Sequence, residues 1–316
     1  MIMNSYPLDS SCFKLPERVT LTEVCPRDGF QNIEQWIPTE TKINIIEGIF
    51  RSGAKNIEVT SFVSPKAIPQ MKDAATVAEY AVAMAKDTDV NIMALIPNVK
   101  GAERALSCGI KKVNYIISAS PLHNQKNMNR TPQQSFEALC ELKKNLPEAE
   151  VTLGVATAFG CPFQGKVPVS DVIALMRSAQ EIGINSFTLC DTIGVANPRQ
   201  VELLLHEVKQ NFSNIQLALH LHNTHGMALA NIYAAMLQGV DRFESAIGGL
   251  GGCPFAPGAA GNAATEDLVN MLNRMGINSN IDLAKLLDVA NQIRELVPCS
   301  ISGMLIKARR YDEFSF

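Results

Sequence analysis

The 316-residue sequence has no excess of basic residues. The chain contains 28 Lys and Arg residues and 31 Asp and Glu residues, which gives a formal net charge of −3. Proteins that bind nucleic acids usually gather Lys and Arg into a patch or stripe. Because this chain contains no basic run, we expect neither DNA nor RNA as a partner.

Long apolar runs are also absent, although 47% of the residues are hydrophobic. A helix needs about 18–20 consecutive apolar residues to cross a bilayer, and no stretch of the chain approaches that length. Residues 1–19 show neither the charged-then-apolar order of a secretory signal nor an Arg-rich amphipathic pattern. We therefore expect a soluble, cytoplasmic protein with no membrane partner.

Paired cysteine motifs are missing as well. The sequence has no CxxC pair, and its eight cysteines are scattered over a chain long enough to build an ample core, which favours reduced thiols. Most of them are expected to be small buried hydrophobes. They stand at positions 12, 25, 108, 140, 161, 190, 253 and 299.

Short β-rich runs alternate with longer amphipathic segments along the whole chain. The starts of these runs are about 32 residues apart on average, which is the length that a strand–helix unit needs. Eight such units predict a TIM barrel, that is, a closed (β/α)8 barrel. An open doubly wound sheet typically has about six strands, and its nucleotide-binding form carries G-x-G-x-x-G after the first strand, where this chain has CPRDGFQN. The expected strands are 19–24, 56–62, 90–96, 112–118, 150–156, 186–190, 216–222 and 242–247.

Helices are expected between these strands. The first should be capped by Thr39 and closed by Gly53. Segment 265–298 reads as two more helices, and no Pro/Ser/Gly linker divides the chain. We therefore expect one domain over 1–316, with the barrel at about 19–264 and a helical extension at about 265–298. The helices expected between strands are 39–53, 72–86, 99–108, 132–145, 170–182, 198–211 and 227–238.

A TIM barrel builds its active site at the carboxyl ends of its strands, so polar residues there are candidates for chemistry. His220 and His222 close the seventh strand, and the period of 2 points both side chains the same way. Two adjacent imidazoles in a barrel mouth are a metal-ligand arrangement. A pair of histidines hydrogen-bonded in a polar layer is the alternative.

Carboxylates stand at or near the ends of three strands. Arg27 and Asp28 follow the first strand, where Asp28 could ligate a metal and Arg27 could face developing negative charge. A structural Arg–Asp contact is the alternative. Glu58 lies within the second strand and Asp191 at the end of the sixth, and burial would require both to be paired, for catalysis or for structure.

A Gly-rich loop, GGLGGCPFAPGAAGN at 248–262, follows the eighth strand. Such loops serve close backbone approach or mobility. Cys253 within it could act as an acid, a base or a nucleophile, or be an inert thiol. Asn262 could offer an amide oxygen to a metal or cap the next helix.

One motif is rejected. Residues 160–166 have P-loop spacing, but Val167 replaces the Ser/Thr that holds magnesium and Pro162 removes a backbone N–H. The segment is therefore expected to be the loop after the fifth strand.

Together these motifs resemble the 3-hydroxy-3-methylglutaryl-CoA lyase family, within the metal-dependent TIM-barrel lyases and synthases. The Gly-rich Cys loop is the most specific of them, and the resemblance runs from about residue 19 to 295. The matching stretches are EVCPRDGFQN (23–32), NIEVTSFVSPKAIPQM (56–71), FGCPFQGKV (159–167), CDTIGVANP (190–198), HLHNTHGMALAN (220–231) and GGLGGCPFAPGAAGNAATEDLVNML (248–272).

The resemblance implies a divalent cation, Mg²⁺ or Mn²⁺, held by Asp28, His220, His222 and Asn262. Such an ion would polarise a tertiary hydroxyl. A base would take the hydroxyl proton, with His220 or Asp28 as candidates. Cleavage of the C2–C3 bond would then give acetoacetate and an acetyl-CoA enolate.

The resemblance also implies roles for the other candidates. Arg27 would stabilise the enolate oxygen, and Cys253 would deliver a proton on a mobile loop. Glu58 and Asp191 would belong to a supporting acid/base network. The partner would be an acyl-CoA substrate, and we expect a homodimer with the apolar C-terminal helices as the interface.

The sequence departs from the family pattern at three places. Asn223 and His225 stand where the family commonly has Asp and Tyr in H-x-H-D-T-Y-G, and Pro121 stands where Glu follows Ser. Segment 123–130 could touch the CoA phosphates or be an ordinary solvated loop. A lyase for a related 3-hydroxy-acyl-CoA, an acetyl-CoA-dependent synthase and a non-catalytic acyl-CoA-binding barrel remain the alternatives.

Overall fold

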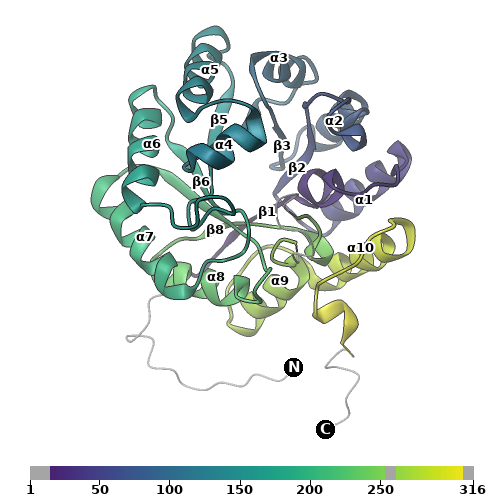
Figure 1. Cartoon of the computed structure of the whole chain (residues 1–316). Coiled ribbons are helices and arrows are strands. Elements are labelled where there is room, and N and C mark those ends of the chain that lie inside the picture. Colours follow the sequence, from purple (N-terminus) through teal and green to yellow (C-terminus); the bar gives the residue numbers. More distant parts are fainter. Residues whose placement is uncertain (1–14, 253–260, 309–316) are drawn as a thin grey trace.

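The computed structural model describes residues 15–252 and 261–308 and contains a closed eight-stranded barrel (Figure 1). Each strand pairs in parallel with the next, and β8 pairs with β1. All eight predicted strands are present, so the barrel prediction is confirmed. The strands are β1 Thr20–Glu23, β2 Asn56–Ser61, β3 Asn91–Leu95, β4 Lys112–Ser118, β5 Glu150–Ala156, β6 Ser186–Asp191, β7 Gln216–Leu221 and β8 Arg242–Ser245.

Helices form a ring outside the barrel (Figure 1). Two further helices, α9 and α10, follow β8, and α10 packs beside α1, the first helix of the barrel. The single-domain organisation of 1–316 stays a prediction. The predicted helices are α1 Thr39–Arg51, α2 Ala74–Ala85, α3 Val99–Ser107, α5 Pro132–Asn145, α6 Val169–Glu181, α7 Pro198–Asn211, α8 Ala228–Leu237, α9 Thr265–Arg274 and α10 Leu283–Leu296.

Strand β4 shows how the alternation divides inside from outside. Asn114 points into the barrel, where its amide donates to Glu58 of β2. Tyr115 points outward, where its hydroxyl donates to the backbone of Ser135 on α5. The main apolar core therefore lies between the barrel and its helices, and the barrel interior is free to carry polar chemistry.

The start of α1 differs from the prediction. The N-cap residue is Pro38, and no side chain caps the helix. Thr39 is the first helical residue, and its hydroxyl donates to Asp73 at 2.9 Å, so it joins α1 to the start of α2. The prediction that Thr39 caps this helix is therefore wrong, whereas Gly53 does follow the helix with φ +95°.

The segment after β4 is a helix, which the sequence analysis missed. Helix α4, Pro121–Met128, starts at Ser120, whose side chain accepts a hydrogen bond from the backbone N–H of His123. Ser followed by Pro is a helix-start signal, because the hydroxyl satisfies a free N–H and Pro has none to satisfy. Segment 123–130 is therefore mainly helix and not a loop; His123 and Asn124 are buried, whereas Gln125, Lys126 and Asn127 are exposed to solvent.

Other expectations hold within the described ranges. Residues 160–166 lie between β5 and α6, where Cys161 and Gly165 exchange backbone hydrogen bonds in a tight turn. The six cysteines described form no disulfide. In the part of the chain that the structure covers, no helix is long and apolar enough to cross a membrane.

The contact between α1 and the C-terminal segment gives a stability test. A Cβ at Gly53 would lie 2.5 Å from the carbonyl oxygen of Asn280. Gly183 has a similar φ of +83°, but among the described residues nothing lies within 4 Å of its added Cβ. We predict that Gly183→Ala costs about 1 kcal/mol, for the left-handed backbone alone. Gly53→Ala should cost about 2–4 kcal/mol, because overpacking adds to the backbone term.

Urea unfolding of both variants measures these costs. Equal losses at the two positions would contradict the close packing of 280 against the end of α1.

Candidate active site

A cavity of about 430 Å³ opens at the carboxyl ends of the barrel strands. Its polar wall includes Arg27, Asp28, His220, His222 and Glu244, which come from opposite ends of the sequence. The apolar part of its lining, the apolar wall, comes from the segment after β2, from β3 and the residues after it, from β4 and from α4. The apolar wall includes Val63, Ile68, Leu95, Ile96, Ile116 and Met128.

Arg27 and Asp28 lie on a single π-helical turn, η1 (Cys25–Gly29), directly after β1. The turn forms because the carbonyl of Val24 accepts hydrogen bonds from the N–H groups of Arg27, Asp28 and Gly29. Wide turns of this kind are common at functional sites. Here the turn brings a cation and a carboxylate, adjacent in sequence, to the barrel mouth.

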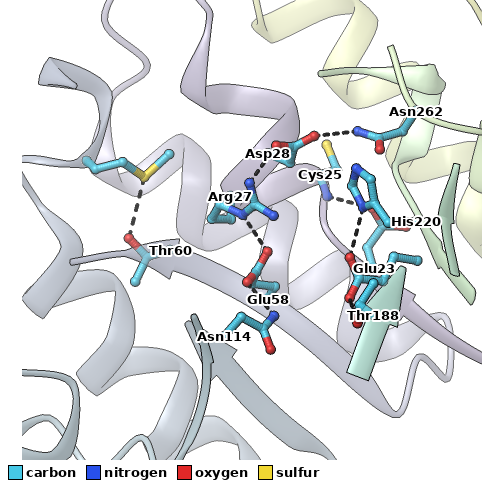
Figure 2. A network of polar contacts seen from close by, with 12 residues as sticks. Glu23, Cys25, Arg27, Asp28, Glu58, Thr60, Asn114, Thr188, His220 and Asn262 are labelled. Atoms are coloured by element: carbon cyan, nitrogen blue, oxygen red, sulfur yellow. Dashed lines mark hydrogen bonds and ion pairs between the residues drawn. The ribbon is translucent and has the colours of Figure 1, made fainter. Parts of the chain in front are cut away.

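The guanidinium of Arg27 is buried between two carboxylates, those of Asp28 and Glu58 (Figure 2). The amide of Asn114 donates to the second oxygen of Glu58 at 2.7 Å. A buried guanidinium is tolerated only when its charge is paired and hydrogen-bonded. Arg27 is therefore held rigidly, with its charge facing the cavity.

The two histidines of β7 converge as predicted. Nε2 of His220 lies 3.0 Å from Nε2 of His222, and ligand atoms of both rings and of Asp28 lie within 4.8 Å of one another. Nδ1 of His220 lies 2.8 Å from a carboxylate oxygen of Glu244. Burial lowers the pKa of His220, but the hydrogen bond and the charge of Glu244 outweigh it and raise the pKa. Because the carboxylate only accepts hydrogen bonds, Nδ1 keeps its proton when the imidazole is neutral, and the lone pair of that form lies on Nε2, toward His222 and Asp28.

Asn262 completes this cluster. Its side-chain N–H₂ donates to Asp28 at 2.7 Å and to the carbonyl of Leu250 at 2.8 Å. Its carbonyl oxygen is buried and has no hydrogen-bond partner among the described residues. Helix α9 begins at Thr265 and its N-cap residue is Ala264, so Asn262 does not cap it. Of the two roles expected for Asn262, metal ligation is therefore the one that its unpaired amide oxygen fits.

The charges of the cluster suit a cation. Burial raises the pKa of Asp28, but the charge of Arg27, followed by the two neighbouring imidazoles and the hydrogen bond from Asn262, lowers it to about 2. Burial and then the charge of His220 lower the pKa of His222 to about 4. The carboxylate is thus anionic and the imidazole of His222 neutral at pH 7, which are the forms that bind a metal. One carboxylate, two imidazoles and one amide oxygen fit a divalent cation with positions left for substrate.

One predicted catalytic residue, Asp191, stands apart from the described cluster, and another lies outside the described residues. Asp191 ends β6, but its oxygens accept the backbone N–H groups of Val195 and Ala196 at 3.0 and 2.9 Å, and it does not line the cavity. Burial raises its pKa to about 6. Its visible task is to hold the loop before α7. Cys253 lies outside the described residues, and Gly252, just before it, lines the cavity.

The positions that depart from the family pattern do not orient the two metal-site histidines. The side-chain oxygen of Asn223 accepts the N–H of Ala228, and Nδ1 of His225 donates to the carbonyl of Gly194. The carboxylate that contacts one of them, His220, belongs to Glu244, which sequence reasoning missed, whereas Nδ1 of His222 has no hydrogen-bond partner among the described residues. A charged residue in the middle of a barrel strand was the available signal, because it is costly to bury there without a partner.

Glu23 is a second missed residue, and it joins the two loops that carry the site. One of its oxygens accepts the N–H groups of Cys25 and Ile247, at 2.9 and 3.0 Å, and the other accepts the hydroxyl of Thr265 at 2.7 Å. It therefore links η1 to the short 3-10 turn η3 (Ile247–Gly249) after β8. Burial raises the pKa of Glu23 to about 8, against these three hydrogen bonds.

This raised pKa predicts how stability depends on pH. The folded chain keeps a proton on Glu23 up to about pH 8, whereas the unfolded chain releases it near pH 4.5. The stabilisation is therefore full below pH 4.5 and is lost as the pH rises to about 8. Glu23→Gln keeps the neutral shape, so it should be about 3–5 kcal/mol more stable than the parent at pH 8 and similar to it at pH 4.5.

Urea midpoints across this pH range test the prediction, with Glu202→Gln on the exposed face of α7 as the matched control. A Glu23→Gln variant that is less stable than the parent at pH 8 would show that Glu23 is ionised in the folded protein.

Comparison with known proteins agrees with this geometry. The model of the HMGL-like family matches residues 18–293. Hydroxymethylglutaryl-CoA lyase of Bacillus subtilis is 45% identical over 89% of this chain and 93% of that protein.

Solved structures extend the likeness to three dimensions. The crystal structure of the Bacillus subtilis HMG-CoA lyase superposes with a TM-score of 0.88 at 43% identity, over 93% of this chain and 98% of that one. An HMG-CoA lyase from Acinetobacter baumannii, in complex with coenzyme A and 3-methylmalate, gives a TM-score of 0.90 at 42% identity, over 95% and 97% of the two chains. The chain therefore belongs to the HMGL-like family, and the resemblance that the motifs indicated is confirmed.

Proposed function

We propose that this protein is a hydroxymethylglutaryl-CoA lyase that cleaves 3-hydroxy-3-methylglutaryl-CoA to acetoacetate and acetyl-CoA with Mg²⁺ or Mn²⁺. The observation that carries the proposal is the convergence of Asp28, His220, His222 and Asn262 beside the buried guanidinium of Arg27. The similar proteins are named for this activity, and one similar structure holds coenzyme A.

The cation site accounts for the start of the reaction. A bound divalent cation supplies Lewis-acid polarisation, which lowers the pKa of a hydroxyl brought to it. The chain supplies the base. Asp28 is anionic and has a second oxygen for the hydroxyl proton, whereas Nε2 of His220 could take that proton only while it does not ligate the cation. Asp28 and His220 remain the two candidates for the base.

Arg27 accounts for the end of the reaction. Cleavage leaves negative charge on the thioester oxygen of the departing enolate, and a preorganised cation at that point stabilises it without rearrangement. Arg27 is fixed for this by Glu58 and Asp28. We assign delivery of a proton to the enolate carbon to Cys253, and support of the active-site loops to Asp191.

The apolar wall and α4 suit the rest of the substrate. Val63, Leu95 and Ile116 offer a surface for the methyl-bearing chain, and the polar wall faces the hydroxyl end. His123 and Asn127 of α4 line the cavity on the side to which we assign the coenzyme. This placement keeps segment 123–130 as the contact region for coenzyme A, now as a helix.

The homodimer is also part of the proposal. Leu296 at the end of α10 is 52% exposed, and Met304 beyond it is 69% exposed. Apolar side chains at this end of the chain are suited to bury against a second copy. Sedimentation equilibrium of the parent and of a Leu296→Glu variant tests it, and a parent that is monomeric at micromolar concentration would exclude the dimer.

Turnover tests the proposed reaction. Incubation with 3-hydroxy-3-methylglutaryl-CoA and Mg²⁺ should release acetoacetate and acetyl-CoA, and chelation by EDTA should stop the release. His222→Ala removes one of the four proposed ligands, so we predict a loss of turnover of at least about 100-fold. His206→Ala on the exposed face of α7 is the matched control and should keep parental activity.

The outcomes separate substrate from mechanism. No product from a parent protein that binds Mn²⁺ would refute the substrate, and equal activity of His222→Ala and His206→Ala would refute the cation site.

A further inference from the structure

Glu244 of β8 makes the contact that sets the state of His220. One of its carboxylate oxygens lies 2.8 Å from Nδ1 of His220, and the other accepts the hydroxyl of Thr188 on β6 at 3.1 Å. All three side chains are buried. Both oxygens of Glu244 are therefore occupied, one by the imidazole and one by the hydroxyl that holds the carboxylate in place.

The strand pairing explains why these side chains meet. His220 pairs with Glu244 across β7 and β8, and it pairs with Cys190 across β6 and β7. Thr188 lies two residues before Cys190, so it lies on the same face of β6, one layer below. The hydroxyl thus reaches the carboxylate from beneath, across the interior of the barrel.

Glu244 and Thr188 also occupy a special position in the barrel interior. They line the active-site cavity, and they line a second cavity of about 660 Å³ at the amino-terminal ends of the strands. The pair therefore forms part of the floor that separates the two. A side chain between two cavities has little packing to fix it, so its hydrogen bonds must do so.

The two nitrogens of His220 have different tasks. If Nδ1 carries the proton, Nε2 presents a lone pair toward His222 and Asp28. If Nε2 carries the proton instead, a hydrogen atom points toward His222 and Asp28, and the cluster has no lone pair of His220 with which to bind a cation. A carboxylate at Nδ1 selects the first state, because it only accepts hydrogen bonds.

We propose that Glu244, held by Thr188, is a positioning residue that fixes the tautomer and ring orientation of His220 and thereby completes the cation site. For turnover this inference rests on the proposed function. For cation binding and for the tautomer it does not, so Mn²⁺ affinity and imidazole ¹⁵N shifts test it even if the substrate is another acyl-CoA.

The direct test removes the carboxylate. Glu244→Ala should weaken Mn²⁺ binding, measured by electron paramagnetic resonance, by about 10–100-fold. Glu244→Asp keeps the carboxylate one methylene shorter and should lose less. Thr188→Val removes only the neutral hydrogen bond that holds Glu244, so a loss of about fivefold is expected.

Matched controls come from the same part of the barrel. Glu150→Gln removes a carboxylate from the lining of the second cavity, and Thr152→Val removes a hydroxyl that bonds Ser186 instead of Glu244. Both should bind Mn²⁺ within about twofold of the parent, because neither touches His220.

Two further measurements distinguish positioning from a structural role. In ¹⁵N spectra of the metal-free protein, recorded at a pH at which the imidazole of His220 is neutral, His220 should show protonated Nδ1 and unprotonated Nε2, and Glu244→Ala should abolish that preference. Formate, a small carboxylate, should restore part of the Mn²⁺ affinity of Glu244→Ala and none of that of His222→Ala.

The inference is overturned if Glu244→Ala folds and binds Mn²⁺ within twofold of the parent. It is equally overturned if His220 carries its proton on Nε2 in the parent. If Glu244→Ala does not fold, Thr188→Val and Glu244→Asp decide: parental Mn²⁺ affinity in both, with unchanged ¹⁵N shifts, would refute it.

Discussion

The buried charge of Arg27 is the constraint on which the rest of the site depends. Glu58 on β2 and Asp28 on η1 both bind its guanidinium. Because an unpaired guanidinium in this position would be strongly destabilising, these three groups must stay together. Asp28 is thereby placed beside His220 and His222, and one ion-pair cluster locates both the proposed cation ligands and the group that we propose meets developing negative charge.

Two further carboxylates, those of Glu23 and Glu244, hold the site residues in place. Glu23 joins η1 to η3, the turns after β1 and β8, through backbone N–H groups. Glu244 joins β8 to His220 on β7 and to Thr188 on β6. The barrel interior is thus organised in layers, with an outer set that faces substrate and an inner set that fixes its geometry.

Sequence periodicity predicted the parts of this structure that depend on one strand at a time. The alternation of His220 and His222 and the position of Asp28 after a strand were enough to predict a shared site. Contacts between strands were not predictable, because they depend on the register in which neighbouring strands pair. The sequence alone does not show that Glu244 of β8 lies opposite His220 of β7. Likewise Thr39 has the residue type and position of a helix cap, but its hydroxyl donates to Asp73 at the start of another helix. Helix α4 was missed because its sequence is polar, and the burial of His123 and Asn124 depends on contacts that form only in the folded chain.

The most direct test is to locate the ion itself. Crystals of the protein grown with Mn²⁺ should show one anomalous-scattering peak in the active-site cavity, within about 2.0–2.4 Å of oxygen and nitrogen atoms of Asp28, His220, His222 and Asn262. A peak that those four side chains do not share, or none at saturating Mn²⁺, would contradict the account.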